Sequence, residues 1–402
     1  MRNITMSNEM NIKKAYVATN GCHGSETQVR QYAETFSRKG YLLTARVEDA
    51  DVIVADLCSF THQAKSDSVG WLKSIESQRK PTSEVIVTGC YLGINPGSVE
   101  AVVPRVRYMT KEQMRTFSGN TLATPIVPGY VDAEGVLKLK IEDGCGGKCT
   151  FCAIPNGVGR RYSYPLDLIM STIQNYVGEH PGTTVKFVGE DIGFYGLDRK
   201  DGTTILTLLD KVKDLEGDFN VRIDVVNPWW FLRYPHLIDS MAEGVSANRI
   251  VPYVGVPLQS GSDTILKSMK RLYSRLQFEG VLDTLLEKIP SLGLSSEVIV
   301  GFPGETDTDF KHTFEVVDKY NFNPLGVWGY TPFEGTDSFH FENKVNSNVI
   351  QERMEMLVAL VIDKEKKKRG CTTLEELCAQ MEQQGFLPLN TNGKNLFTGV
   401  RQ

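Results

Sequence analysis

The chain has 402 residues, 41% of them hydrophobic, and it carries 44 Lys and Arg against 49 Asp and Glu, for a formal net charge of -5. This length allows two or three domains with a sizeable core, and the charge balance excludes a global basic field for nucleic acid. The polar residues 1–14 lack a long apolar run, so we expect a cytoplasmic protein without a membrane span. Eight cysteines then indicate metal ligands or catalytic groups more than disulfides.

Three cysteines of the first domain follow predicted strands. The predicted strands cover residues 14–18, 51–56 and 84–88, and helices at 26–38 and 64–75 separate them. Strands that alternate with helices indicate a parallel sheet, whose carboxyl ends lie along one edge. Cys22, Cys58 and Cys90 each come just after a different strand. We therefore predict that their thiols converge on one metal centre. The alternative is that these are ordinary, partly buried cysteines. That alternative explains their burial but not why a cysteine follows each of three strands.

A second group of cysteines lies on a Gly-rich loop, where residues 143–152 read Asp-Gly-Cys-Gly-Gly-Lys-Cys-Thr-Phe-Cys. Thiolates at this C-x3-C-x2-C spacing can bind three corners of a cubane iron–sulfur cluster, and the fourth iron then stays open to a small molecule. A zinc site or three buried cysteines are the alternatives. Structural zinc normally takes four protein ligands, and neither a second C-x2-C pair nor a nearby histidine is present.

The second domain repeats the order of strand and helix. Predicted strands lie at 136–141, 184–188, 220–225, 249–254, 297–300 and 326–330, and predicted helices at 166–177, 205–215, 264–269, 276–288 and 307–320. Such repeated units indicate a complete or partial (β/α) barrel whose site lies at the carboxyl ends of the strands. The predicted fold class is thus α/β: an N-terminal parallel-sheet domain at 1–115, a barrel at 130–345 and a helical C-terminal segment at 346–402.

The C-terminal segment begins with a long predicted helix at 346–369 that ends in the basic run 364–369, and a shorter helix follows at 372–384. A basic run at this place is usually a solvated helix end that complements the helix dipole, with RNA contact as the alternative. Cys371 and Cys378 belong to no motif and are expected to be plain thiols.

In combination and order, these features resemble the methylthiotransferase family of radical S-adenosylmethionine (SAM) enzymes over roughly residues 14–365. The matching segments are the three strand-end cysteines, the loop from Cys145 through Cys149 and Cys152 to Pro155, residues 257–262 (Pro-Leu-Gln-Ser-Gly-Ser) with Met269 and Arg271, residues 301–306 (Gly-Phe-Pro-Gly-Glu-Thr), residues 330–332 and residues 334–336.

The resemblance implies two 4Fe–4S clusters and a sulfur insertion reaction. The open iron at Cys145, Cys149 and Cys152 would bind SAM, whose cleavage gives a deoxyadenosyl radical that takes hydrogen from an unactivated C–H bond. An auxiliary cluster on the three strand-end cysteines would present sulfur to the carbon radical, and a second SAM would supply the methyl group. A reducing partner such as flavodoxin or ferredoxin is implied as well.

Five residues outside the clusters are implied to bind SAM. Gly189 and Glu190 resemble the element that holds the SAM amine, and a carboxylate suits an ammonium. Arg271 would pair with the SAM carboxylate, while Gly301 and Gly304 would let the backbone approach the adenosyl group. The alternative for Glu190 and Arg271 is an ordinary surface pair.

The chain also departs from the family pattern. Val158 and Tyr164 stand where family members carry arginines, and Asp56 with Leu57 precedes Cys58 where they carry Asn and Thr. The aspartate adds negative charge beside the auxiliary cluster, which is expected to alter its potential. Only 33 residues (402 minus 369) follow the long helix, so we expect the RNA-binding barrel of the family, called TRAM, to be absent.

These departures bear on which molecule accepts the methylthio group. Residues 189–198 are more similar to the branch that modifies an aspartate of a ribosomal protein than to the tRNA-adenosine branches. We therefore predict a peptide or protein side chain as acceptor, with a modified adenosine of tRNA as the alternative. A non-catalytic two-cluster electron carrier or sensor is a third interpretation. Cobalamin chemistry is disfavoured because the first domain has no Asp-x-His-x-x-Gly segment, its histidines being His23 and His62.

Overall fold

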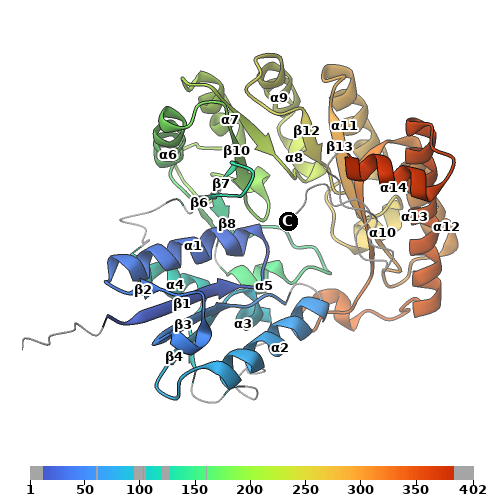
Figure 1. Ribbon diagram of the computed structural model, residues 1–402. Coiled ribbons are helices and arrows are strands. Elements are labelled where there is room, and N and C mark those ends of the chain that lie inside the picture. The colour runs from blue at the N-terminus through green and yellow to red at the C-terminus, as the bar shows by residue number, and fades with distance from the viewer. Residues whose placement is uncertain are drawn as a thin grey trace, which may run out of the picture. The chain divides into compact units, whose positions relative to one another are not determined.

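The computed structural model in Figure 1 describes residues 12–59, 62–94, 103, 106–119, 127, 129–159 and 161–383, apart from the side chains of His23, His62 and Glu382. The chain divides into two compact units. The first unit comprises Met1–Tyr130, Lys138–Lys140 and Ile154–Arg160, and the second comprises Val131–Leu137, Ile141–Ala153 and Arg161–Gln402. The predicted domain boundaries stay predictions, and residues 384–402, where the missing TRAM barrel was inferred, lie outside the described residues.

The first unit is built on a five-stranded parallel sheet of order β2-β1-β3-β4-β5. Its strands are β1 (Lys14–Thr19), β2 (Leu42–Leu43), β3 (Val52–Asp56), β4 (Glu84–Thr88) and β5 (Arg107–Tyr108). The pairing aligns the last residues of the three central strands, because Thr19 pairs with Asp56 and Asp56 pairs with Thr88. The predicted parallel sheet is confirmed, and its carboxyl edge ends at one level.

Helices cover both faces of this sheet (Figure 1). Val52, Val54 and Ile86 pack in one core with α1 (His23–Arg38) and α4 (Lys111–Phe117). The alternate residues Ile53, Ala55 and Val85 pack in a second core with α2 (His62–Gln78). Because both faces are buried, the strands are apolar throughout instead of alternating between apolar and polar. The short helices α3 (Cys90–Ile94) and α5 (Ile154–Val158) complete the unit, together with the 3-10 turn η1 (Val47–Asp49).

The other strands form a partial barrel. One sheet has the order β11-β10-β7-β6 and another the order β12-β13-β14, and the parallel bridges Val221–Ile250 and Val225–Gly255 connect β11 to β12. A short antiparallel pair, β8 with β9, stands beside them. The bounds are β6 (Gly129–Val131), β7 (Leu137–Lys140), β8 (Glu142–Asp143), β9 (Tyr162–Ser163), β10 (Thr183–Val188), β11 (Phe219–Ile223), β12 (Tyr253–Gly255), β13 (Gly293–Val300) and β14 (Phe322–Gly329). The predicted partial barrel is confirmed.

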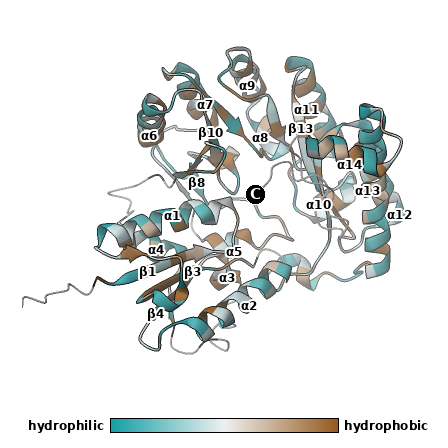
Figure 2. Cartoon of the chain, in the orientation of Figure 1, coloured by the Kyte–Doolittle hydropathy of each residue, from teal (hydrophilic) through white to brown (hydrophobic). Residues whose placement is uncertain are grey.

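Helices follow the barrel strands, with hydrophilic residues dominant on α12 and α13 (Figure 2). They are α6 (Leu166–Glu179), α7 (Ile205–Asp214), α8 (Pro228–Arg233), α9 (His236–Ser246), α10 (Asp263–Ser268), α11 (Arg275–Lys288), α12 (Asp307–Lys319), α13 (Ser347–Arg369) and α14 (Leu374–Gln383), with 3-10 turns η2 (Ile192–Phe194) and η3 (Asp337–His340). The prediction missed α8 and α9. Within the described residues, no helix has the length and apolar character to cross a membrane.

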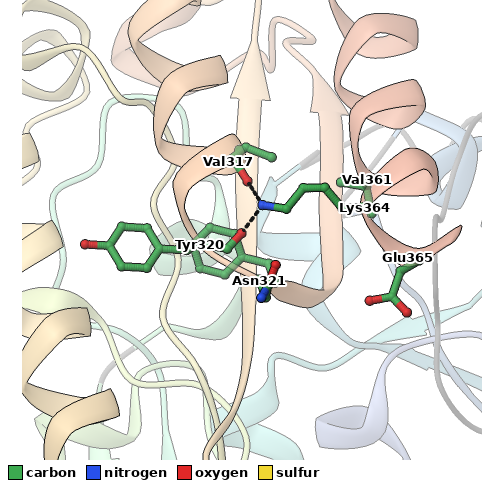
Figure 3. Close-up of a pocket in the computed structure, with 7 residues that line it drawn as sticks. Val317, Tyr320, Asn321, Val361, Lys364 and Glu365 are labelled. Atoms are coloured by element: carbon green, nitrogen blue, oxygen red, sulfur yellow. Dashed lines mark hydrogen bonds between the residues drawn. The ribbon is translucent and has the colours of Figure 1, made fainter. Parts of the chain in front are cut away.

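The basic end of α13 serves packing. The Lys364 ammonium donates to the carbonyl oxygens of Val317 (2.9 Å) and Tyr320 (2.7 Å) at the end of α12, as Figure 3 shows. It also donates to the carbonyl oxygen of Asp318 (2.5 Å). A cation suits this place because the last carbonyls of a helix carry partial negative charge. Burial lowers the pKa of Lys364. The run predicted to be a solvated helix end is therefore solvated only in part.

A buried ion pair ties α13 to the Gly-Phe-Pro-Gly-Glu-Thr segment. The side chains of Arg353 and Glu305 are 6% and 0% exposed and lie 2.6 Å apart, N to O. The same carboxylate accepts a hydrogen bond from the Gly301 amide (2.7 Å). Removing one member of such a pair leaves a buried charge without compensation.

We expect Arg353→Met to lower the free energy of unfolding by about 3–5 kcal/mol, measured by urea denaturation followed by tryptophan fluorescence. The control is Arg38→Met, because the Arg38–Glu34 pair is 58% and 63% exposed, and its loss is expected to cost less than about 1 kcal/mol. Equal losses in the two variants would contradict a special role for the buried pair.

Candidate functional site

The sheet register brings the three strand-end cysteines of the first unit to one edge. Cys22 is the N-cap of α1, Cys58 follows β3 by two residues, and Cys90 opens α3 two residues after β4. Adjacent strands are roughly 5 Å apart, so the three loops are direct neighbours. Cys22 is exposed, while Cys58 and Cys90 are half-buried. That these thiols bind a common cluster stays a prediction.

Backbone contacts lock two of these loops together. Gly89 has a φ of +101°, and a Cβ on it would lie 2.4 Å from the carbonyl oxygen of Leu57. The Leu57 amide donates to the Thr88 carbonyl (2.8 Å), and the Tyr91 amide donates to the Leu57 carbonyl (3.1 Å). Position 89 therefore requires a glycine, because any side chain there would collide with the backbone of Leu57.

A side-chain bridge connects the remaining loop. The Cys58 amide donates to Asn20 Oδ1 (3.1 Å), and Asn20 Nδ2 donates to Ser68 Oγ (2.8 Å). Ser68 Oγ in turn donates to the Cys58 carbonyl (2.5 Å). The loop that carries Cys22 is thus joined to the loop that carries Cys58.

Asp56, the departure beside Cys58, is buried among opposite charges. Its side chain accepts from Thr19 Oγ1 (3.2 Å). Burial raises the pKa of Asp56, and Lys111, Ser25 and Thr19, together with Lys140, act in the opposite direction. Lys111 and Lys140 are themselves only 4% and 0% exposed. The net effect is a raised pKa, so the environment disfavours the negative charge that was expected beside Cys58, even with two buried lysines nearby.

In the second unit, the cluster loop curls around Gly147. The Gly147 amide donates to Cys145 Sγ (3.2 Å), and a Cβ on this residue would lie 3.2 Å from Cys145 Sγ and 3.8 Å from Cys149 Sγ. The Cys152 amide donates to the Cys149 carbonyl (3.1 Å). The sulfur atoms of Cys145 and Cys149 therefore lie on the same side of the loop, next to Gly147.

The electrostatics of the loop suit a cationic cluster. Burial raises the pKa of the Cys145 thiol well above its ordinary value, and the charges of Asp191, Cys152 and Cys149 raise it further. Thiols bind metal as thiolates, so a positively charged partner is needed to ionise this group. Iron supplies that charge, and the donor set fits a cluster. Within the described residues, no group of three or more His, Cys, Asp or Glu side chains is arranged to hold a metal ion, so the cluster on this loop stays a prediction.

Aromatic rings close one side of the loop. A Cβ on Gly146 would lie 2.0 Å from Cζ of Phe194, so the ring rests directly on this glycine. Phe194 packs edge-on against Trp230 with ring centroids 4.8 Å apart. Trp230 Nε1 donates to Asp191 Oδ1 (2.8 Å), and Asp191 Oδ2 lies 3.9 Å from Cys145 Sγ. Burial raises the pKa of Asp191 to about 6.

Glu190 and Arg271 both reach the cluster loop and are not an ordinary surface pair. Glu190 Oε2 accepts from the Gly144 amide (2.9 Å). Arg271 Nη1 donates to Cys149 Sγ (3.2 Å), and its Nε donates to the Tyr273 hydroxyl (3.0 Å). Its Nη2 is buried and finds no partner among the described residues. An acid and a guanidinium at one loop are suited to the amine and carboxylate of an amino acid.

The predicted glycines have packing roles as well. A Cβ on Gly189 would lie 2.3 Å from Glu142 Oε1, the oxygen that accepts from the Asp191 amide (3.0 Å). Gly301, with a φ of +76°, has Ile350 of α13 where its Cβ would be, the nearest atom at 2.2 Å. Gly304, with a φ of +85°, has open space there. Adenosyl contact by Gly301 and Gly304 stays a prediction.

The two positions that lack family arginines are filled by buried side chains. Val158 is 4% and Tyr164 is 1% exposed. The Tyr164 hydroxyl donates to Asp143 Oδ2 (3.1 Å), two residues before Cys145, and the Tyr164 carbonyl accepts from the Tyr195 hydroxyl (2.8 Å). A neutral phenol thus supports the loop where an arginine would bring charge.

Two family models match the chain: the radical SAM superfamily over residues 139–317 and uncharacterized protein family UPF0004 over residues 14–110. The ribosomal protein uS12 methylthiotransferase RimO of Fervidobacterium nodosum is 30% identical over 359 residues, covering 86% of this chain and 82% of that protein. The chain belongs to the radical SAM methylthiotransferase family. A tRNA-2-methylthio-N(6)-dimethylallyladenosine synthase of Fusobacterium nucleatum is 29% identical over 368 residues, 86% of this chain and 83% of that protein.

Solved structures agree with the fold of this methylthiotransferase. The radical SAM methyltransferase TsrM of Kitasatospora setae, solved with tryptophan and a SAM analogue, superposes with a TM-score of 0.58 at 11% identity. The match covers 81% of this chain and 75% of that chain. At this identity the similarity concerns the fold alone. Membership of the family implies an enzyme that uses SAM and a 4Fe–4S cluster.

The contact between Gly146 and Phe194 gives a test of the loop. We expect Gly146→Ala to displace the loop, since the added Cβ meets the ring, and to lower the iron retained after anaerobic reconstitution several-fold. Gly146→Ala combined with Phe194→Ala should recover most of the iron. The control is Gly178→Ala on α6, where a Cβ has open space. Full iron in the single variant would refute this role of the ring.

Proposed function

We propose that this enzyme replaces a C–H bond by C–SCH3 on a peptide or protein side chain, using two 4Fe–4S clusters. The main support for the proposal is the pairing of β1, β3 and β4. Their last residues are aligned, and a cysteine follows each strand. When bound, the clusters and SAM supply reductive cleavage, hydrogen abstraction and the transfer of sulfur and methyl. A radical SAM enzyme that needed only one cluster would have no use for three more thiols in equivalent positions.

Different residues around the cluster loop bind the cluster and SAM. Cys145, Cys149 and Cys152 hold one cluster and leave one iron open for SAM. Glu190 receives the SAM ammonium, and the unpartnered Nη2 of Arg271 receives its carboxylate. Bidentate binding of this kind orients a zwitterion, so these two residues position SAM without taking part in bond breaking.

Two further side chains act on the surroundings of this cluster. Asp191 is held by Trp230 Nε1 and lies near Cys145 Sγ. Phe194 covers Gly146. Together they limit the access of water to the loop, which keeps a reactive carbon or sulfur species from side reactions.

In the first unit, Cys22, Cys58 and Cys90 hold the auxiliary cluster. The bonds from Asn20 and Ser68 fix the Cys58 loop, and Gly89 fixes the Cys90 loop. Exposure of Cys22 and partial exposure of the other two leave an open side to the site. A cluster held there would be accessible from that side and would supply the sulfur that is transferred.

Replacing the two groups of cysteines one at a time distinguishes the roles of the two clusters. We expect alanines at Cys145, Cys149 and Cys152 to halve the iron and abolish the formation of deoxyadenosine from SAM. Alanines at the three strand-end cysteines should halve the iron but keep deoxyadenosine formation, since the cluster that binds SAM remains. Iron analysis and chromatography of the reduced protein with SAM give both readouts.

The matched control changes Cys371 and Cys378 to alanine, which should leave the iron unchanged. Full iron and full methylthio transfer in the variant without the strand-end cysteines would refute the auxiliary cluster. Absence of deoxyadenosine in the unchanged protein would favour a non-catalytic electron carrier or sensor.

The charge distribution supports a protein acceptor. The formal net charge is -5, and the basic end of α13 is partly occupied, because Lys364 binds carbonyl oxygens and Arg369 Nε lies 3.0 Å from Glu365. A basic helix end with part of its cations paired offers fewer groups for the phosphate contacts that dominate RNA affinity. The similarity of segment 189–198 to the branch that modifies a ribosomal protein also supports a protein acceptor. A cytoplasmic location and a flavodoxin- or ferredoxin-like reductant belong to the same proposal.

The alternative acceptor is a modified adenosine of tRNA, favoured by the similarity to the Fusobacterium nucleatum synthase. We expect no shift of bulk tRNA by this protein in gels at about 0.15 M salt, near physiological ionic strength. Mass spectrometry should find an added methylthio group on ribosomal protein uS12 or on a peptide encoded beside this protein. A strongly salt-dependent shift, with methylthio-adenosine in digested tRNA, would reverse the assignment.

A further inference from the structure

Tyr273 connects the side chain of Arg271 to the Pro-Leu-Gln-Ser-Gly-Ser segment of the second unit. The tyrosine is only 4% exposed. Its hydroxyl accepts from Arg271 Nε (3.0 Å) and donates to the carbonyl oxygens of Pro257 and Leu258, each 2.9 Å away. A phenolic hydroxyl both accepts and donates, so it anchors the guanidinium to the backbone of that segment.

The backbone near Arg271 is fixed to the cluster loop. Thr150 of this loop donates from its amide to the Met269 carbonyl (3.2 Å) and from Oγ1 to the Ser268 carbonyl (2.9 Å). The Arg271 amide in turn donates to the Leu266 carbonyl of α10 (2.9 Å). With the main chain held in this way, the direction of the guanidinium depends on the contacts of the side chain.

Two contacts fix that direction. Nε of Arg271 donates to the Tyr273 hydroxyl, and Nη1 donates to Cys149 Sγ (3.2 Å). A guanidinium is planar and rigid, so holding Nε and Nη1 also determines where Nη2 points. Nη2 is buried and has no partner among the described residues. A buried donor without a partner is costly, and a carboxylate that binds there would remove this cost.

We infer that Tyr273 is a positioning residue, which holds the Arg271 guanidinium in the orientation that leaves Nη2 available to the carboxylate of SAM. The inference rests on the proposed function, in which Arg271 binds SAM. Tyr273 itself touches neither SAM nor the cluster in this account, and it acts only through Arg271. Its hydroxyl therefore contributes to the affinity for SAM and not to the cleavage step.

The competing explanation is that Tyr273 acts on the cluster. Nη1 of Arg271 lies against Cys149 Sγ, and hydrogen bonds to the sulfurs tune the reduction potential of a cluster. Loss of the Tyr273 hydroxyl would then change the reduced cluster in the absence of SAM. It would also change the rate of cleavage at saturating SAM.

The test replaces Tyr273 by Phe, which removes the hydroxyl and keeps the ring. We expect Tyr273→Phe to retain its iron and its kcat for deoxyadenosine formation, while the KM for SAM rises about 10-fold, the effect of one hydrogen bond to a charged group. A higher KM at unchanged kcat indicates lost binding. Titration with a non-cleavable SAM analogue, followed by electron paramagnetic resonance of the reduced cluster, should show the same rise in Kd without turnover.

The matched control is Tyr320→Phe. Tyr320 is also 4% exposed, and its hydroxyl donates to Asp283 Oδ1 of α11 (2.7 Å). The control should leave the iron, the KM and the kcat unchanged. A second comparison uses Arg271→Lys, which keeps the charge but has no planar fork to orient. In that background, Tyr273→Phe should change the KM by less than about 2-fold, because residues that act through one another are not additive.

An unchanged KM in Tyr273→Phe would overturn the inference. Iron loss in this variant, an altered resonance of its reduced cluster without SAM, or equal effects on the KM in both backgrounds would overturn it as well. These measurements need neither an acceptor nor the auxiliary cluster. If the unchanged protein cleaves SAM but transfers no methylthio group, the proposed function fails while the role of Tyr273 stands. If it forms no deoxyadenosine, both fail.

Discussion

Parallel pairing of β1, β3 and β4 is the constraint on which the proposed sulfur-donating site depends. The pairing aligns Thr19, Asp56 and Thr88, so the loops that carry cysteines leave the sheet from one edge at one level. Apolar residues on both faces of the strands fix this register, because a slip by one residue would exchange the core facing α1 with the core facing α2. Ordinary core packing thereby determines where the three thiols lie.

The cluster loop depends on a different balance, that between burial and charge. Burial and neighbouring negative groups disfavour the thiolate of Cys145, while Arg271 donates to Cys149 Sγ. A bound iron would add the positive charge that favours the thiolate form of Cys145. In the first unit, Lys111 and Lys140 similarly offset Asp56.

Sequence patterns were sufficient for the features with strong local signals. Alternation of strand and helix predicted the sheet and the partial barrel. The strand-end positions of Cys22, Cys58 and Cys90 are confirmed, while the binding of clusters by the six cysteines stays a prediction. Helices α8 and α9 escaped prediction although Asn227 caps α8 with a proline at its first position, because the apolar run 228–233 has no clear helical period. Asp191 and Trp230 were missed because their pairing joins residues 39 positions apart. Gly301 shows why a glycine is hard to interpret from sequence. The glycine packs closely against Ile350, and a glycine needed for close packing looks the same in the sequence as one needed for contact with a ligand.

The central claim is that one chain holds two clusters and that only one of them binds SAM. Mössbauer spectroscopy of protein reconstituted with 57Fe tests it most directly. Two 4Fe–4S clusters predict about eight irons per chain, and addition of SAM should change the signal of about one iron in eight. About four irons per chain, or a spectrum in which SAM alters no iron site, would contradict the account.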